Sequence, residues 1–475
     1  MAATSSMLHL YEYGVVWARR TIGTVFAPPP CLRANAAWNK LLWLMAAMVT
    51  SLAFVLPAQA GLPIQHWQSA SGAQVYFVEN HDLPILDLSV GFAAGSSFDV
   101  GEKAGVAALT QGLLSLGAGG LSDDQISNRF ADLGAQLGGD FDADRAGLKL
   151  RTLSSERERT GSLQLFATLL QQPDFSTVVL EREKARVIAG LREAATQPES
   201  ISSKAFGKAL YGNHPYAMGE MVEPETVEKI GRDDLIAFHH SHYTRGNAVI
   251  AIIGDITRVQ AVQIAEQMTA NLPNGTAQSV IPPVPLLAAA VEKRIPHPAA
   301  QSHILLGYPG MKRGDPDYYA LYVGNYVLGG GGFVSRLTEE VREKRGLAYS
   351  VYSYFLPLRQ EGPFQIGLQT KREQTDQALA LVRQTLKKFI QDGPTAKELQ
   401  AAKDNIIGGF PLRIDSNGKI LDYLAVIGFY QLPLTYLDDF NKQIDKVTTA
   451  QIKDAFKRRI DPDKMVTVIV GDDGK

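Results

Sequence analysis

The sequence predicts an α+β fold of two homologous α/β sandwich domains, joined by a proline-rich linker. Three observations support this prediction: a duplicated set of strand-like runs, a proline-dense segment near the middle, and strands that do not alternate one-for-one with helices. Strict alternation would instead favour a doubly wound parallel sheet. A chain of 475 residues is long enough for two or three domains.

The duplication is visible at two landmarks. Apolar runs at 248–253 and 466–470 are each followed directly by Gly-Asp, at Gly254 and at Gly471. Strand-like runs at 86–91 and 303–307 each lead through a glycine-containing loop into a helix. The offset along the sequence is nearly the same for both landmarks. Nearly equal offsets at two independent places indicate an internal duplication.

The linker is expected where proline is dense. Residues 271–285 contain four prolines, which remove backbone donors and favour an extended, solvated chain. The predicted organisation is therefore a leader over residues 1–60, a first domain over 61–272, the linker over 273–290 and a second domain over 291–475.

Two helices of the second domain are predicted from local patterns. Residues 378–389 place apolar side chains at a spacing near 3.6. Thr395 and Glu398 form a capping-box signature at the start of the next helix, which is expected to end at Gly408-Gly409.

The leader has the pattern of a secretory signal peptide. An apolar run at 41–56 follows Arg33 and Lys40, and Ala58-Gln59-Ala60 has the small-x-small pattern of a cleavage site. We expect cleavage near Ala60 and a periplasmic or secreted protein. The alternative is an uncleaved membrane anchor, although the run is shorter than the roughly twenty residues of a membrane span.

Composition narrows the possible functions. Nothing in the net charge of −2 or the 20% charged fraction suggests nucleic acid as a partner, since that would call for a concentrated basic face. The single cysteine, Cys31, lies in the leader, so the mature chain has no disulfide, thiol nucleophile or cysteine-based metal site.

Two blocks of sequence resemble one family. The stretch 328–337, Leu-Gly-Gly-Gly-Gly-Phe-Val-Ser-Arg-Leu, is followed by Val-Arg-Glu-Lys-Arg-Gly-Leu-Ala-Tyr-Ser at 341–350. This resembles the C-terminal signature of the pitrilysin, insulinase and mitochondrial-processing-peptidase family. His214-Pro215-Tyr216 and the stretch 243–247 are similar to the first domain of the same family. The resemblance covers nearly all of the mature chain and implies duplicated α+β units.

The resemblance also implies a zinc site that this chain lacks. Active members carry H-x-x-E-H on the first helix of the first domain, where two histidines bind zinc and the glutamate activates water, and a later glutamate completes the ligands. There is no histidine here between His81 and His214. We therefore expect no metal or cofactor in this chain and zinc in a partner subunit. The degenerate positions are Ala108, Gln111, Gly112 and Gly190.

Arg342 and Tyr349 match a functional pair of the family. The resemblance implies that both are catalytic and stabilise the oxyanion formed by attack on a peptide carbonyl. Arg345 and Tyr352 have the same spacing, but the sequence around Tyr349 favours the first pair. The alternative is a structural role, with the arginine in a salt bridge and the tyrosine against the core.

The run Gly329, Gly330, Gly331 and Gly332 has two interpretations. Such loops let another chain approach closely, so it is a candidate substrate-binding element. The alternative is a tight turn that needs positive φ. Two other clusters are expected to be structural. The first, near a helix C-terminus, consists of His239, His240 and His242. The second, on a polar strand face or loop, consists of Asp140, Asp142 and Asp144.

These observations favour the non-metal-binding subunit of a bacterial heteromeric zinc endopeptidase. It would be inactive alone and would supply Arg342 and Tyr349 to a homologous H-x-x-E-H subunit in a heterodimer or larger assembly, with peptides as substrates. The alternative is a catalytically inert scaffold or peptide-binding protein of the same fold. A pure scaffold has no chemical reason to keep the arginine–tyrosine pair.

Overall fold

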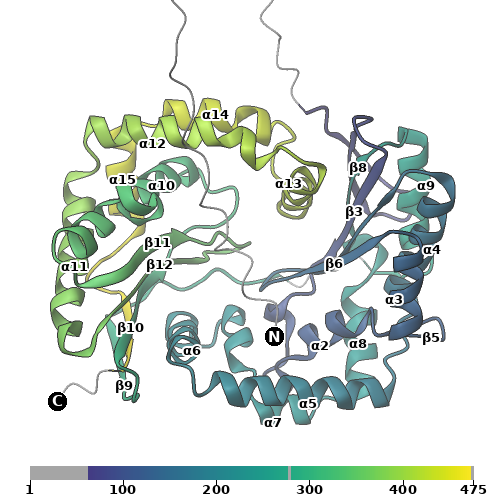
Figure 1. The fold of residues 1–475 in the computed structure, drawn as a ribbon, viewed down its shortest axis with the longest axis horizontal. Helices are drawn as coiled ribbons and strands as arrows, with labels where there is room; N and C mark the ends of the chain where they lie inside the picture. Colours follow the sequence, from purple (N-terminus) through teal and green to yellow (C-terminus); the bar gives the residue numbers. More distant parts are fainter. Residues whose placement is uncertain (1–61, 276–279, 472–475) are drawn as a thin grey trace, which may run out of the picture. The chain divides into compact units, whose positions relative to one another are not determined.

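The computed structural model describes residues 62–275 and 280–471, so the predicted leader lies outside the described residues. Two mixed sheets are flanked by helices (Figure 1), which confirms the α+β prediction. The six-stranded sheet has the order β1-β2-β8-β3-β7-β6, and the five-stranded sheet has the order β11-β12-β10-β13-β9. In the described ranges, no helix combines the length and apolar character that a membrane crossing requires.

The strands are β1 (Gln65–Gln68), β2 (Gln74–Glu79), β3 (Ile85–Phe92), β4 (Gly117–Ala118), β5 (Leu121–Ser122), β6 (Gln136–Phe141), β7 (Ala146–Leu153), β8 (Val249–Gly254), β9 (Val291–Ile295), β10 (Gln301–Pro309), β11 (Ala348–Phe355), β12 (Pro363–Lys371) and β13 (Val466–Val470). The α-helices are α2 (Val106–Leu113), α3 (Asp123–Asp132), α4 (Glu156–Gln171), α5 (Thr177–Ala194), α6 (Pro198–Tyr211), α7 (Pro224–Glu228), α8 (Arg232–His242), α9 (Arg258–Thr269), α10 (Tyr318–Asn325), α11 (Thr375–Asp392), α12 (Ala396–Gly409), α13 (Asn417–Tyr430), α14 (Tyr436–Lys446) and α15 (Thr449–Arg459).

The strand register reproduces the predicted duplication. In the first sheet β3 pairs with β8 antiparallel, with Gly91 opposite Val249. In the second sheet β10 pairs with β13 antiparallel, with Gly307 opposite Val466. The step along the sequence from Gly91 to Gly307 nearly equals the step from Val249 to Val466. The two landmarks found in the sequence are therefore paired central strands of two equivalent sheets.

Helix α13, from the second half of the chain, packs on the first sheet against β2, β3 and β8 (Figure 1). Gly428 allows this close approach, because a Cβ there would lie 2.7 Å from atoms of Tyr76 and Val249. The buried contact is apolar on both sides. Its members are Val78, Ala251 and Ile253 from the strands and Ile420, Leu421, Leu424 and Ala425 from α13.

Helix α6, from the first half, packs in turn on the second sheet against β10 and β13. Gly307 allows this approach, because a Cβ there would lie 2.2 Å from the ring of Phe206. Each half thus covers apolar strands of the other with one helix. Unfolding one half would therefore expose apolar surface of the other half to water, so we expect the two halves to unfold together.

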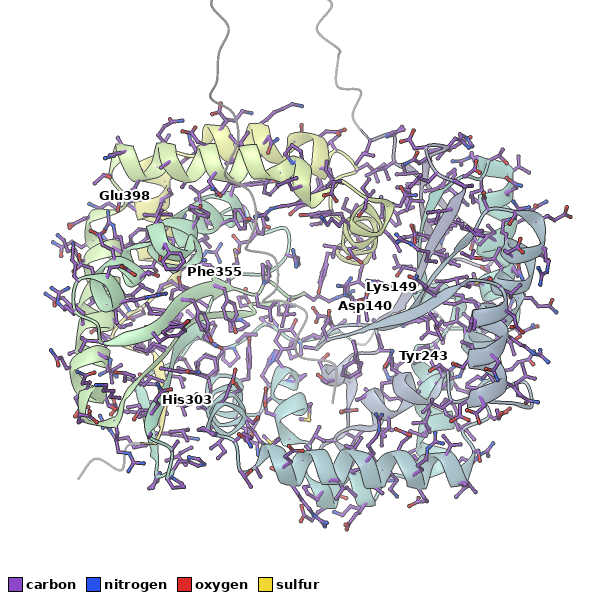
Figure 2. The ribbon with its side chains drawn as sticks, viewed as in Figure 1. Asp140, Lys149, Tyr243, His303, Phe355 and Glu398 are labelled. Atoms are coloured by element: carbon purple, nitrogen blue, oxygen red, sulfur yellow. The ribbon has the colours of Figure 1, made fainter. Side chains whose placement is uncertain are left out.

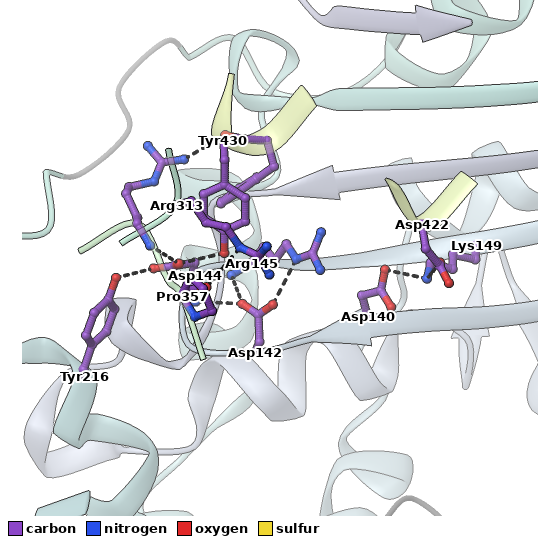
Figure 3. A network of polar contacts seen from close by, with 12 residues as sticks. Asp140, Asp142, Asp144, Arg145, Lys149, Tyr216, Arg313, Pro357, Asp422 and Tyr430 are labelled. Atoms are coloured by element: carbon purple, nitrogen blue, oxygen red, sulfur yellow. Dashed lines mark hydrogen bonds and ion pairs between the residues drawn. The ribbon is translucent and has the colours of Figure 1, made fainter. Parts of the chain in front are cut away.

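A buried carboxylate also joins the halves (Figure 3). Asp144 is fully buried and accepts hydrogen bonds from the hydroxyls of Tyr216 and Tyr430, each at 2.9 Å, and from the backbone N–H of Arg359 at 2.7 Å. Tyr430 is the last residue of α13, so this hydrogen bond connects the second half of the chain to the first. Burial raises the pKa of the Asp144 carboxyl, and the three hydrogen bonds oppose that rise. The expected polar loop therefore contains one residue that is not solvated.

Removing one of the hydrogen-bond donors to Asp144 should weaken the connection between the two halves. Tyr430→Phe deletes a hydrogen bond to a buried carboxylate, so we expect the free energy of unfolding to fall by about 1.5–3 kcal/mol. Denaturant unfolding followed by circular dichroism measures it. Tyr354→Phe is the control, because the Tyr354 hydroxyl makes no hydrogen bond within the described residues. Equal unfolding free energies for the two variants would show that the hydrogen bonds to Asp144 do not stabilise the fold.

The predicted capping box of α12 is present and extended by an ion pair. The Glu398 carboxylate accepts from the backbone N–H of Thr395 and pairs with Arg336 at 2.6 Å, and Figure 2 labels its position. Arg336 binds both carboxylate oxygens and lies over the ring of Phe389 at 5.2 Å. The Arg336 guanidinium, helped by Thr395, lowers the pKa of Glu398 from 4.5 to about 2.

This pair should make stability depend on acid pH. Because the folded-state pKa is depressed, the contribution is complete above pH 4.5 and is lost as the pH falls toward 2. A shift of this size corresponds to about 3 kcal/mol at about 1.4 kcal/mol per pKa unit, but Glu398 is only partly buried, so screening by solvent reduces the expected contribution to about 1–2 kcal/mol. Glu398→Gln keeps a capping-box acceptor but removes the charge, so its deficit in unfolding free energy should be largest at pH 7 and shrink below pH 4.5. Asp463→Asn removes an exposed ion pair with Lys387 and serves as the control.

Candidate functional site

The structure brings Arg342 and Tyr349 together on an exposed surface. Arg342 belongs to a π-helical turn, η7 (Thr338–Glu343), and Tyr349 to β11. The Arg342 guanidinium carbon lies 5.2 Å from the centre of the Tyr349 ring and 4.8 Å from that of Phe333. Tyr349 is 80% exposed, so it does not cap the core. Single π-helical turns are frequent at functional sites.

Most donors of Arg342 are unused. Its only ion pair within the described residues joins Nε to the Glu343 carboxylate at 3.3 Å, and its guanidinium makes no other hydrogen bond there. The terminal N–H groups of the guanidinium are therefore available to an oxygen of another molecule.

A break in the β11–β12 ladder turns Tyr349 outward. Ala348 pairs with Thr370 and Ser350 with Gln369, so the register shifts at Tyr349 and leaves it without a partner in β12. Bulges of this kind re-aim side chains and are common beside active sites. The exposure of Tyr349 thus has a local backbone cause.

The competing pair, Arg345 and Tyr352, is not assembled. Arg345 donates to the carbonyl and the carboxylate of Glu340, at 2.9 and 2.7 Å. Tyr352 instead stacks on Tyr354, with ring centres 6.1 Å apart. No hydrogen bond or ring contact joins Arg345 to Tyr352 in the described part of the chain. Of the two pairs with equal spacing, only Arg342 and Tyr349 are in contact.

The glycine run packs beneath β11. A Cβ on Gly329 would lie 2.4 Å from the Ser353 hydroxyl oxygen, and one on Gly331 would lie 2.7 Å from the Tyr326 carbonyl oxygen. Gly332 has a φ of +61°. Close packing and one left-handed residue therefore explain why three of these positions need glycine. Their role in substrate binding stays a prediction.

The degenerate zinc positions lie on exposed helix surface. Ala108 and Gly112 are one helical turn apart on α2, and Gly190 is exposed on α5. None of the three has a side-chain nitrogen, oxygen or sulfur, so the residues present do not fit zinc. A Cβ on Gly112 or Gly190 would meet no atom within 4 Å. Gln111 turns its amide toward the carbonyl of Gly147, at 3.4 Å.

Residues 62–275 and 280–471 contain no group of three His, Cys, Asp or Glu side chains suited to a metal ion. The histidines at the end of α8 bond to backbone instead: His239 Nε2 contacts the Leu170 carbonyl at 2.9 Å, and His242 Nδ1 contacts that of Ala93 at 3.2 Å. Burial lowers the pKa of His239 to about 4, so it is neutral at physiological pH.

Both groups of candidate residues adjoin an open sheet edge. Strand β6 forms one edge of the first sheet, and a Cβ on its Gly139 would lie 2.6 Å from Gln111 of α2. Strand β11, which carries Tyr349, forms one edge of the second sheet. The unpaired backbone groups of an edge strand can bind an extended peptide as an added strand.

Comparison with known proteins identifies the family. The family model described as "Insulinase (Peptidase family M16)" matches residues 75–221, and that described as "Peptidase M16 inactive domain" matches residues 229–406. The crystal structure of a peptidase M16 inactive domain from Pseudomonas fluorescens is similar to this chain. It has a TM-score of 0.84 and 41% identity, covering 86% of this chain and 98% of that chain.

Two curated relatives extend the comparison. A Helicobacter pylori protein named "Non-peptidase homolog YmxG" is 27% identical over 84% of this chain and 92% of its own length. A Bacillus subtilis protein named "Uncharacterized zinc protease YmxG" is 26% identical over 75% of this chain and 86% of its own length. As the sequence resemblance indicated, the chain belongs to peptidase family M16.

Proposed function

We propose that this chain is the non-metal-binding subunit of a two-chain zinc endopeptidase and supplies Arg342 and Tyr349 to the active site of its partner. The main supporting observation is the exposed contact between the Arg342 guanidinium and the Tyr349 ring, at 5.2 Å. The zinc positions of the same chain offer no ligand atom, so the pair has no metal of its own to act with.

The chemistry fits these two side chains. Attack on a peptide carbonyl places negative charge on its oxygen, which a guanidinium and a phenol hydroxyl stabilise by hydrogen bonds. One such donor typically contributes about 2.7–4 kcal/mol to lowering the barrier. The unused N–H groups of Arg342 can bind the oxygen without first breaking a strong ion pair. Open strand edges next to the site suit an extended peptide substrate.

The partner we propose is a homologous chain with an intact H-x-x-E-H motif, in a heterodimer or larger assembly, with the leader directing this chain to the periplasm. The names of its relatives fit both members of such a pair, since one is called a non-peptidase homologue and another a zinc protease. An inert scaffold is the second candidate, because the lost zinc ligands alone would suit it equally well.

Reconstitution tests the proposal. This chain, purified without its leader, is mixed with an H-x-x-E-H homologue from the same organism and zinc, and cleavage of a quenched fluorescent peptide is followed. We expect cleavage only when both chains are present, and none when the partner's motif glutamate is replaced by glutamine. A partner that is fully active alone would refute the proposal. Activity that needs both chains but tolerates the loss of Arg342 would favour the scaffold.

A further inference from the structure

Phe333 is a large apolar side chain with no core to fill. It lies in a short 3₁₀ turn, η6 (Gly332–Val334), and is 70% exposed. Its ring faces the Arg342 guanidinium at 4.8 Å, while the ring of Tyr349 faces the same group at 5.2 Å. Two exposed aromatic rings therefore contact a single cation.

The backbone holds Phe333 in this place. Gly332 adopts a φ of +61°, and its carbonyl accepts from the backbone N–H of Ser335 at 3.1 Å and from the Ser335 hydroxyl at 2.8 Å. The buried Ser335 hydroxyl also contacts that of Thr338, the first residue of η7, at 3.1 Å. A hydrogen-bonded path thus links the turn that presents Phe333 to the turn that presents Arg342.

Ring faces position an arginine without using its donors. A long, exposed guanidinium loses rotamer freedom when it is fixed, and an ion pair that fixed it would occupy N–H groups. Cation–π contacts are made through the face of the guanidinium and leave its N–H edge available. Glu343 offers only a 3.3 Å contact to Nε, so the rings are the main restraint on Arg342.

We propose that Phe333 is a positioning residue, which holds the Arg342 guanidinium against Tyr349 with its N–H edge free for a substrate oxygen. The catalytic consequence rests on the proposed function, whereas the contact itself can be measured in this chain alone.

The contact is tested by NMR of the arginine side-chain N–H groups in the deuterated chain, with the Arg342 signal assigned from Arg342→Lys. Ring currents should shift the Arg342 signal upfield. Phe333→Leu should move it toward the position of an unstacked arginine, and Phe333→Tyr should keep it. Val334→Ala is the control, because Val334 is exposed beside Phe333 but has no aromatic ring to stack on the guanidinium. A signal that Phe333→Leu does not move would overturn the proposal.

Kinetics of the two-chain enzyme test the consequence. Because loose positioning of a reacting group is costly, Phe333→Leu should lower kcat about tenfold. KM should change by less than about twofold, because little ground-state binding is lost. Phe333→Tyr should restore kcat. Full kcat in Phe333→Leu, with a reduced kcat in Arg342→Ala, overturns the positioning role alone. Full kcat in Arg342→Ala overturns the proposed function as well, whatever the NMR signal shows.

Discussion

Replacing Arg342 by alanine should lower kcat of the reconstituted two-chain enzyme by about 10²–10³-fold, the usual cost of losing one oxyanion donor. Tyr349→Phe should lower it by a similar factor, because it deletes only the hydroxyl and keeps the ring that contacts Arg342. The loss should appear in kcat and in kcat/KM equally, since the hydrogen bonds strengthen as charge builds on the carbonyl oxygen.

The control for this experiment lies three residues away. Arg345→Ala removes a guanidinium with the same spacing to a tyrosine, but one already held by Glu340, so kcat should be unchanged. Binding of each variant to the partner is measured separately by analytical ultracentrifugation, so that a failure of assembly is not mistaken for lost chemistry. If both Arg342→Ala and Tyr349→Phe kept the wild-type kcat, the chain would be better explained as an inert scaffold.

Local patterns predicted much of the fold because they act over short stretches of chain. The apolar runs became paired central strands, and Thr395 with Glu398 formed the expected capping box. The cross-packing of α6 and α13 could not be predicted, because it depends on contacts between distant segments. Asp144 shows the same limit: it lies in a polar stretch, and nothing nearby indicates that Tyr430, 286 residues later, donates to it.

The contacts of the candidate site could be predicted only in part, for a related reason. Family spacing identified Arg342 and Tyr349, which the structure places in contact. Phe333 was missed because spacing says nothing about a ring presented by a separate turn. The available signal was a phenylalanine directly after a glycine run, since a turn offers no core for a large apolar ring to fill. The bulge at Tyr349 could not be predicted either, because it is a shift in the pairing of β11 with β12, and no local pattern in the sequence marks it.

Restoring the missing ligands should restore zinc binding. In the variant Ala108→His, Gly112→His, Gly190→Glu, the two histidines share one face of α2, and a Cβ at 112 or at 190 would meet no atom within 4 Å. Replacing glycine inside helices also costs no helix propensity. We expect zinc affinity in the micromolar range or tighter by titration calorimetry, equal to about 8 kcal/mol, and a rise in melting temperature with added zinc.

The matched control keeps one ligand only: Ala108→His with Gly112→Ala and Gly190→Ala should bind zinc far more weakly, because a single imidazole cannot replace a three-ligand site. Gln111→Glu can then be added to supply a base for water activation. A folded triple-ligand variant that binds zinc no better than the control would mean that α5 no longer presents position 190 to α2. Zinc binding would instead show that this family member lost its metal through side chains alone, on a scaffold that still has the geometry to hold it.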